Sequence, residues 1–338
     1  MVTKAQKTKF INARLGAFES PWDHRHYRVT PATVKEAAQL PVEYNGLIDY
    51  APTDDFPNQG NVGSCVGWDG SVVMEITNTL LQEYASRTGN NKLLGYIHTD
   101  LSAGWLYHWS RIHAGVPDWQ EGSTNLGLMK ALLKEGTASE ALCPTDIISP
   151  FTYEPKEGAE EEAKKFAIDS YWNVNSNPND IKSAIYGLTH EAPYKMADDS
   201  VGKIPLVSAF PVYDTFSDGY DDGIIPNPKA SDKLRGGHSS AIIGWKIIDG
   251  KEYYINLGSW GKDVGDNGMF YIPSDYPFYA NSWFLVHNGP STPPDPPTPP
   301  TPPTPNPCQI STLVTAPINL GLRLFGRKGR VMYMTPGR

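Results

Sequence analysis

The spacing of apolar residues changes from helical to strand-like near Gly202. From Cys65 to about Tyr84 the apolar side chains share one helical face, and similar helical patterns recur before residue 202, at 102–112, 125–136, 157–168 and 179–188. Short runs rich in branched and aromatic residues follow, at 203–213, 238–248, 251–259, 268–274 and 282–287. Helices followed by strands predict an α+β protein with two lobes. We expect a helical lobe over about 60–200 and a β lobe over about 203–288, completed by 40–56.

A proline-rich run closes this body. Residues 289–307, which include PSTPPDPPTPPTPPTPNP, have few amide donors and predict a polyproline linker. The basic tail beyond it, 308–338, has no acidic residue and is too short to bury much of a core. It is either a docking segment for a partner or an inert solvated end.

Charge and cysteine usage narrow the function class. The net charge of −8 argues against nucleic acid as the main partner, since phosphate binding needs a basic surface. No apolar run approaches the roughly 20 residues of a membrane span, and MVTKAQKTKF carries no apolar core of a signal peptide. The three cysteines are scattered, which argues against a disulfide framework. We therefore expect a cytoplasmic or virion-associated protein.

Three stretches carry residues suited to chemistry. Asn58 to Trp68, NQGNVGSCVGW, places Gln59 six positions before Cys65, where a helix is expected to begin with Ser64 as its N-cap. GGHSSAIIGW puts His238 at a strand start, and GSWGKDVGDNGMFYI leads from one strand to the next. Considered without the other two stretches, Cys65 fits three roles: a packing residue, a metal ligand or a nucleophile.

In this order the stretches resemble the glutamine–nucleophile, histidine and Asn-Ser-Trp-Gly segments of papain-like (cathepsin-like) cysteine peptidases, over about residues 40–287. The resemblance is closest in style to bacterial and viral members without disulfides, because Val62 stands where secreted members have a cysteine. It implies a papain-like two-lobed fold, a helical lobe and an antiparallel β-barrel-like lobe with the active site in the cleft between them. It also implies a cysteine endopeptidase that acts on protein or peptide substrates without a cofactor.

The chemistry supports these roles. A thiol at a helix N-terminus is favoured as thiolate, and an imidazolium from His238 would complete the ion pair. The backbone amide of Cys65 and the side chain of Gln59 would stabilise the oxyanion. Gly60 and Gly63 let the loop turn tightly enough to aim both groups.

One expected residue is missing. The family has an orienting asparagine directly before Ser-Trp-Gly, and this chain has Gly258 there. Asn256, two residues upstream, is the candidate replacement as orienter of His238. Trp260 keeps its family position and is expected to shield the pair from water.

Substrate contacts are expected from Gly122, Ser123, Gly237 and Trp260. The alternative for the first two is a plain helix entrance capped by Ser123 or Thr124. Residues 1–39 are either a short inhibitory segment over the cleft or a brace for the second lobe.

Metal binding is not expected. His24 and His26 lack further ligands, and DVGDNG, Asp263 to Gly268, lacks the spacing of an EF-hand and predicts a turn.

Two other functions stay open. A catalytically impaired papain-fold protein that binds peptides or builds a particle would explain Gly258. A thiol hydrolase acting on peptidoglycan or isopeptide links is the third.

Overall fold

The computed structural model describes residues 3–12, 14–21, 40–46, 56–88, 100–186, 204–279 and 281–286, which belong to one compact unit, Met1–Thr292. The expected linker 289–307, the tail 308–338 and the histidines His24 and His26 lie outside the described residues. None of the described helices combines the length and apolarity that a membrane span requires.

The predicted helices are present. α3, Cys65–Thr88, is the longest, and its buried face carries Val66, Val73 and Leu80. α4, Ala103–Ala114, begins where the Ser102 hydroxyl accepts from the Trp105 amide and ends at Gly115, whose φ of 69° is left-handed. The shorter elements are α5 (Asn125–Lys134), α6 (Ala159–Ala163), η2 (Lys164–Phe166), α7 (Pro178–Ile185) and η3 (Asp214–Gly219).

The strands form one antiparallel sheet in the order β4-β9-β5-β6-β7-β8, with β2 paired to β6. Its members are β2 (Tyr44–Asn45), β4 (Ser170–Asn175), β5 (Leu206–Tyr213), β6 (Leu234–Ile248), β7 (Lys251–Leu257), β8 (Met269–Pro273) and β9 (Asn281–Val286). Among the described strands, β4 and β8 do not pair with each other, so the sheet is open rather than a closed barrel. The turn predicted at 263–268 does join β7 to β8.

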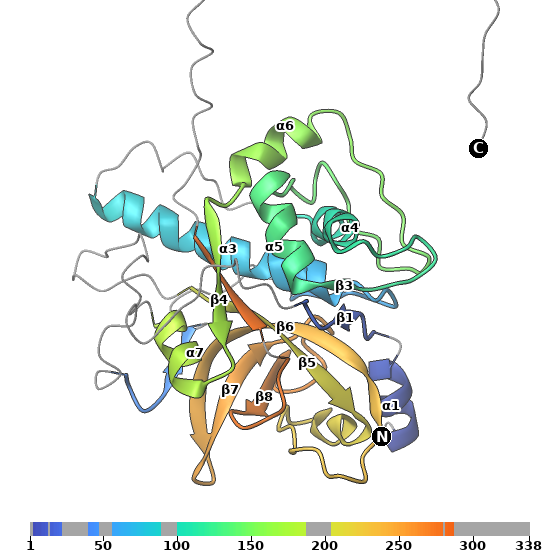
Figure 1. The fold of residues 1–338 in the computed structure, drawn as a ribbon, viewed down its shortest axis with the longest axis vertical. Coiled ribbons are helices and arrows are strands. Elements are labelled where there is room, and N and C mark those ends of the chain that lie inside the picture. The colour runs from blue at the N-terminus through green and yellow to red at the C-terminus, as the bar shows by residue number, and fades with distance from the viewer. Residues whose placement is uncertain are drawn as a thin grey trace, which may run out of the picture. The chain divides into compact units, whose positions relative to one another are not determined.

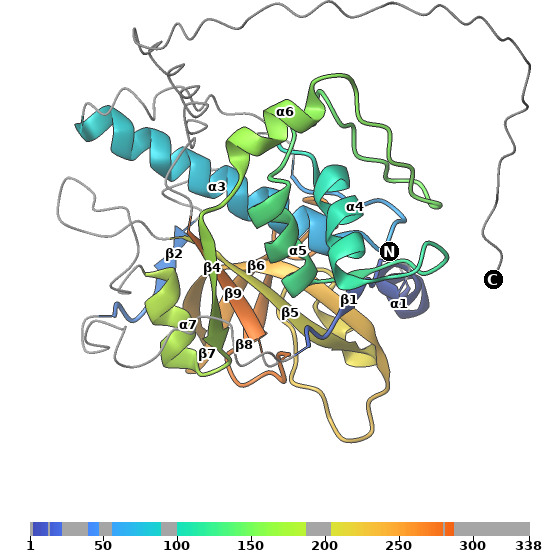
Figure 2. The same ribbon diagram turned by 45° about the horizontal axis from the view of Figure 1, so that its top comes forward.

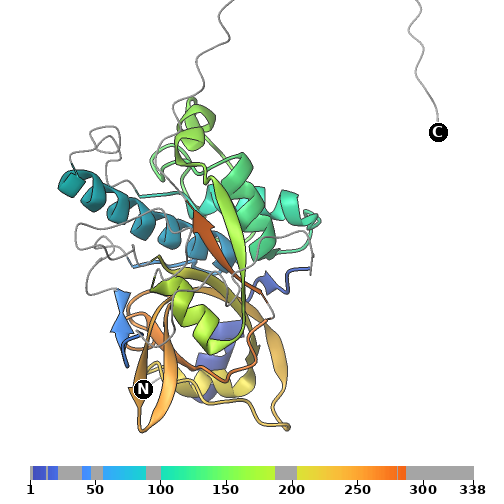
Figure 3. The same ribbon diagram turned by 60° about the vertical axis from the view of Figure 1, so that its left-hand side comes forward.

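β4 was not predicted. It lies within the range assigned to the helical lobe, yet its residues Ser170–Asn175 pair with β9 along their whole length. Figure 3 shows β4 and β9 side by side between the helices and the rest of the sheet. The sequence SYWNVN gives a short strand whose partner is more than a hundred positions away, so no local signal identified it.

α3 is the element that brings the two layers together. In Figure 1 it crosses between the other helices α4, α5 and α6 and the sheet. Ala103 and Tyr107 of α4 pack on Gly67, and a Cβ there would lie 2.3 Å from the Ala103 carbonyl oxygen. Because α3 packs on β6 on its other side, its first residue, Cys65, lies at the junction of helices and sheet.

The N-terminal residues pack against this body. α1, Lys4–Asn12, lies beside η3 (Figure 2), where Lys4 and Lys7 pair with Asp218 and Asp221. A short strand β1, Ala17–Phe18, then pairs in parallel with β3, Ser123–Thr124. This pairing places the N-terminal segment at the entrance of α5, next to the start of α3.

Candidate active site

Cys65 is the first residue of α3 and is fully buried. The backbone amides of Ser239 and Gly16 lie within hydrogen-bonding reach of its sulfur. Ser239 directly follows His238 on β6, so the predicted nucleophile lies beside the strand that carries the predicted histidine, although the two are far apart in sequence. Ser64 does not act as the expected cap, because its buried hydroxyl has no partner among the described residues.

His238 lies against aromatic rings. Its imidazole centroid is 4.3 Å from the Trp260 ring and 5.8 Å from the Phe210 ring, and the residue is 1% exposed. Neither ring nitrogen has a hydrogen-bond partner among the described residues. Trp260 therefore holds and shields the imidazole, as predicted, but by packing alone.

Gln59 is held in place from both ends of its amide. Its Oε1 accepts from the Ser259 hydroxyl at 2.6 Å. Its Nε2 donates to the carbonyl oxygens of Val62, at 2.7 Å, and of Arg14, at 2.9 Å. Ser259 fixes the amide so that its Nε2 donates both to the loop before Cys65 and to the N-terminal segment at Arg14.

That segment, Arg14 to Phe18, covers the candidate site. The Gly16 amide donates to the Gly237 carbonyl at 3.0 Å, and the Gly16 carbonyl accepts from the Ser123 amide at 2.8 Å. A Cβ on Gly16 would lie 1.9 Å from the Gly63 carbonyl oxygen, so only glycine fits there. The sequence allows an inhibitory segment within 1–39, but only the absence of a side chain at Gly16 hints that this residue makes the closest approach.

Ser123 and Gly237, two of the residues expected to contact substrate, both form backbone hydrogen bonds with this segment. Gly122 lies beneath Phe18, whose ring would be 2.7 Å from a Cβ on that glycine. Ser123 and Thr124 form β3, and Thr124 also caps α5 by accepting from the Gly127 amide. The stretch is therefore a helix entrance whose backbone also pairs with β1, and substrate contacts by Gly122 and Ser123 stay a prediction.

Burial decides the charge state of the pair. Desolvation raises the pKa of the Cys65 thiol to about 12, and burial lowers the pKa of His238 to about 3. In the covered form both groups are neutral at pH 7. The segment and the aromatic rings remove the water that charged groups need, so burial favours the neutral forms here, and the thiolate–imidazolium pair stays a prediction.

These shifts predict a bell-shaped stability of the covered form. As pH falls below the ordinary His pKa of 6.5 toward 3, uncovered or unfolded chains take up a proton that buried His238 does not, so stability is lost. As pH rises above the ordinary Cys pKa of 9.0, they release a proton that buried Cys65 retains, and stability is lost again. On each side of the optimum, the stability of the covered form falls by at most about 1.4 kcal/mol per pH unit.

Thermal midpoints from pH 4 to 10 measure this dependence. His238→Ala should flatten the acid limb and leave the alkaline limb in place, and Cys65→Ala should do the reverse. Equal acid limbs with and without His238 would contradict the assignment.

Asn256 does not orient His238 in this structure. Its Oδ1 accepts from the Ser240 hydroxyl at 3.0 Å, and its Nδ2 donates to the Tyr254 carbonyl at 3.3 Å. Asn256 pairs with Ile242, four positions along β6 from the histidine, so its side chain is committed within the sheet. A side chain at Gly258 would meet the Phe270 ring at 2.7 Å, so phenylalanine blocks the place of the missing asparagine.

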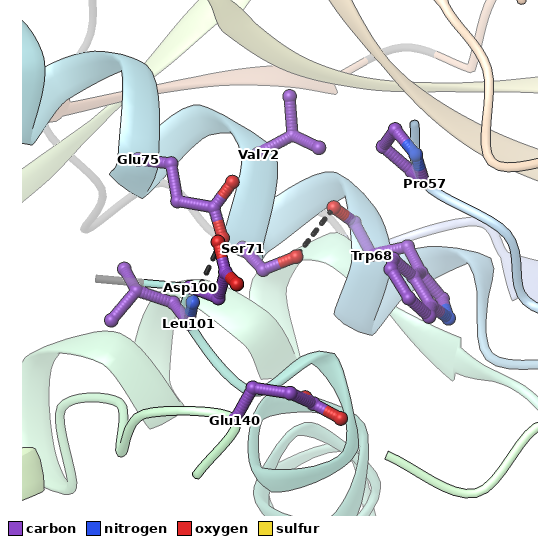
Figure 4. Close-up of a pocket in the computed structure, with 8 residues that line it drawn as sticks. All are labelled: Pro57, Trp68, Ser71, Val72, Glu75, Asp100, Leu101 and Glu140. Atoms are coloured by element: carbon purple, nitrogen blue, oxygen red, sulfur yellow. Dashed lines mark hydrogen bonds between the residues drawn. The ribbon is translucent and has the colours of Figure 1, made fainter. Parts of the chain in front are cut away.

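A separate pocket of about 220 Å³ lies along α3 and the chain around Leu101 (Figure 4). Glu75 accepts from the Leu101 amide at 2.8 Å, and burial raises the pKa of Glu75 to about 8. Trp68 and Pro57 form another part of its wall. The pocket includes neither Cys65 nor His238 and is distinct from the candidate site.

Sequence comparison agrees with this geometry. The family model described as papain family cysteine protease matches residues 130–281, a segment that includes His238 and begins well after Cys65. The chain is 29% identical over 130 residues to cathepsin B-like cysteine proteinase 6 of Caenorhabditis elegans, which is 38% of this chain and 31% of that protein. It is 37% identical over 68 residues to the gut-specific cysteine proteinase of the same organism, 20% of each chain. The matches thus span a third or less of these relatives.

Solved structures show the same fold. Xylellain, a cysteine protease from Xylella fastidiosa, superposes with a TM-score of 0.62 at 19% identity, over 81% of this chain and 96% of that one. ProCathepsin B S9 from Trypanosoma congolense gives 0.57 at 14% identity, over 84% and 89%. Residues 130–281 are thus similar to papain family cysteine proteases, and the chain has the fold of papain-like cysteine peptidases.

Proposed function

We propose that the chain is a cysteine endopeptidase that hydrolyses peptide bonds through Cys65, with His238 as acid–base and Gln59 in the oxyanion hole. One observation carries the proposal: the Gln59 amide already donates to a peptide carbonyl, that of Arg14, in the segment whose Gly16 amide lies near the Cys65 sulfur. A substrate carbonyl oxygen could accept from the same Gln59 N–H once the segment has left.

The reaction follows from these positions. The Cys65 thiol passes its proton to His238, and the thiolate adds to the carbonyl carbon. Gln59 and the backbone amide at the start of α3 stabilise the negative oxygen. His238 then protonates the leaving amine, which departs and leaves an acyl-enzyme. A water attacks this thioester while His238 takes its proton, and His238 returns that proton to the departing Cys65 sulfur, which gives the acid product and the free thiol.

The same contacts support a latent resting form. β1 runs parallel to β3 and lies across the thiol, and Gly16 bonds both Gly237 and Ser123. A substrate needs these backbone groups, so the segment must leave before a peptide enters. Water then reaches Cys65 and His238, and their pKa values return toward ordinary values, which allows the ion pair to form.

The alternative is an impaired papain-fold protein that binds peptides or forms part of a particle. The observation in its favour is the absence of a hydrogen-bond partner for either nitrogen of His238 in the described structure. An imidazole held only by ring packing has no group that selects its tautomer.

Covalent labelling separates the two. Full-length Gly16→Val protein, in which the segment cannot seat, is treated with an epoxide inhibitor selective for papain-type thiols, and adducts are located by mass spectrometry. We expect an adduct on Cys65 that disappears with His238→Ala. Cys143, the other free cysteine of the described residues, is buried and serves as the internal control. A folded variant without an adduct on Cys65 would support the binding protein.

A further inference from the structure

A second hydrogen bond connects the nucleophile helix to the histidine strand. Asp69 lies four residues after Cys65 on α3, one helical turn along the same face. Its Oδ2 accepts from the Ser239 hydroxyl at 2.5 Å. Ser239 directly follows His238, so this bond joins the two elements that carry the reacting pair.

Both partners are deeply buried. Asp69 is 3% exposed and Ser239 is 1% exposed. The Ser239 hydroxyl also lies 2.9 Å from Asn125 Oδ1 and 2.9 Å from the Ser208 carbonyl oxygen. Because neighbouring strand residues point to opposite faces, Ser239 faces α3 while His238 faces the aromatic cluster of Phe210 and Trp260.

The protonation of Asp69 suits this role. Burial raises the pKa of its carboxyl well above the usual range, and no positive group offsets the burial. A neutral carboxyl can donate its own proton and adds no negative charge beside the thiol. A charged Asp69 would oppose the thiolate, since its field raises the pKa of Cys65.

The missing orienter gives this bond its importance. Gly258 supplies no side chain, Asn256 bonds elsewhere, and the imidazole has only ring contacts. The relative placement of sulfur and imidazole must then come from the backbones of α3 and β6. Ser239 reaches both sides, with its amide near the Cys65 sulfur and its hydroxyl on Asp69.

We propose that Asp69 and Ser239 are positioning residues whose hydrogen bond sets the alignment of Cys65 with His238 in place of an orienting asparagine. This inference rests on the proposed peptidase function. The proposal predicts that the Asp69–Ser239 hydrogen bond affects turnover rather than substrate affinity. Both side chains are buried and so cannot contact a bound peptide.

Steady-state kinetics test the pair in full-length protein carrying Gly16→Val. Ser239→Ala and Asp69→Ala should each lower kcat by about 10- to 100-fold, the cost of a small misalignment, with KM within about twofold. The double variant should be no slower than the slower single one, because both remove the same bond. Ser239→Thr and Asp69→Asn, which retain a hydroxyl and an acceptor oxygen, should recover most of the loss.

Ser240→Ala is the matched control. It removes an equally buried hydroxyl from the next position of β6, where the partner is Asn256. The Ser240→Ala variant should have the kcat and KM of the parent protein. Single variants with parental kcat, additive effects in the double variant, or no rescue by threonine and asparagine would overturn the proposal. If Asp69→Ala does not fold, the Ser239 alanine and threonine variants decide alone.

A second measurement does not need peptidase activity. The rate at which iodoacetamide alkylates Cys65 at pH 7, followed by mass spectrometry, reports the thiol–imidazole pair directly. Ser239→Ala should slow it by a similar factor. A parent that is alkylated but cleaves no peptide would refute the proposed function and leave this test in force, whereas equal alkylation rates would refute the positioning role.

Discussion

Replacing Gly16 by valine is expected to raise the peptidase turnover of the full-length chain by about 100-fold. A Cβ at this position would lie 1.9 Å from the Gly63 carbonyl oxygen and 2.9 Å from its Cα, both backbone atoms that cannot move aside easily. If the valine weakens the binding of the segment to the site by about 3 kcal/mol, the fraction of molecules with an open site rises about a hundredfold. Hydrolysis of a fluorogenic peptide at pH 6.5 measures the change.

The control is Glu19→Val, three residues further along. Glu19 is exposed, so the same side chain there should leave turnover at the parental level. Reversing both lysines of α1, Lys4→Glu with Lys7→Glu, should raise turnover only several-fold, because exposed ion pairs contribute about 1 kcal/mol or less. A Gly16→Val protein that is folded and no more active than the parent would show that the segment does not restrain the site.

Gln59→Ala should lower kcat by about 100- to 1000-fold in the Gly16→Val background, the usual cost of one oxyanion donor. The effect should fall on kcat more than on KM, since the donor is needed most when the oxygen carries full charge. Gln59→Glu is the sharper test, because it has nearly the same shape and replaces the donor with a carboxylate. It should be at least as slow as alanine.

Ser259→Ala is a graded companion variant. It removes the hydroxyl that donates to Gln59 Oε1, so the amide stays but is held less firmly, and we expect about a tenfold loss. Thermal midpoints identify any variant that is slow because it is unfolded. A Gln59→Glu enzyme with parental kcat would remove Gln59 from the mechanism.

Local pattern was sufficient for most of the architecture. The apolar stripe after Cys65 predicted α3, and the alternating runs after Gly202 predicted the strands β5 to β9, because helix and strand periods are properties of neighbouring residues. The order of the three stretches predicted Gln59, Cys65 and His238 as the reacting groups, and this assignment stays a prediction. The strand β4 escaped because its six residues are defined by pairing with β9 rather than by their own period.

The electrostatic state of the site could not be obtained in this way. Cys65 at a helix start predicts a thiolate, yet burial raises the pKa of this thiol to about 12, because Gly16 and Ala17 cover it from a segment about fifty positions away. Asn256 had the right residue type near the right place, but its pairing with Ile242 and its bond to Ser240 turned the amide away from His238.

From sequence alone, the chain is determined to be an α+β protein with a cysteine, a histidine and a glutamine in the order of a thiol peptidase. Only the tertiary structure decided that this site is covered, that its pair is neutral, and that Asp69 reaches Ser239 across the two lobes. The physical reason is that periodicity and motif order are local, whereas desolvation and hydrogen-bond choice depend on which distant groups the fold brings into contact.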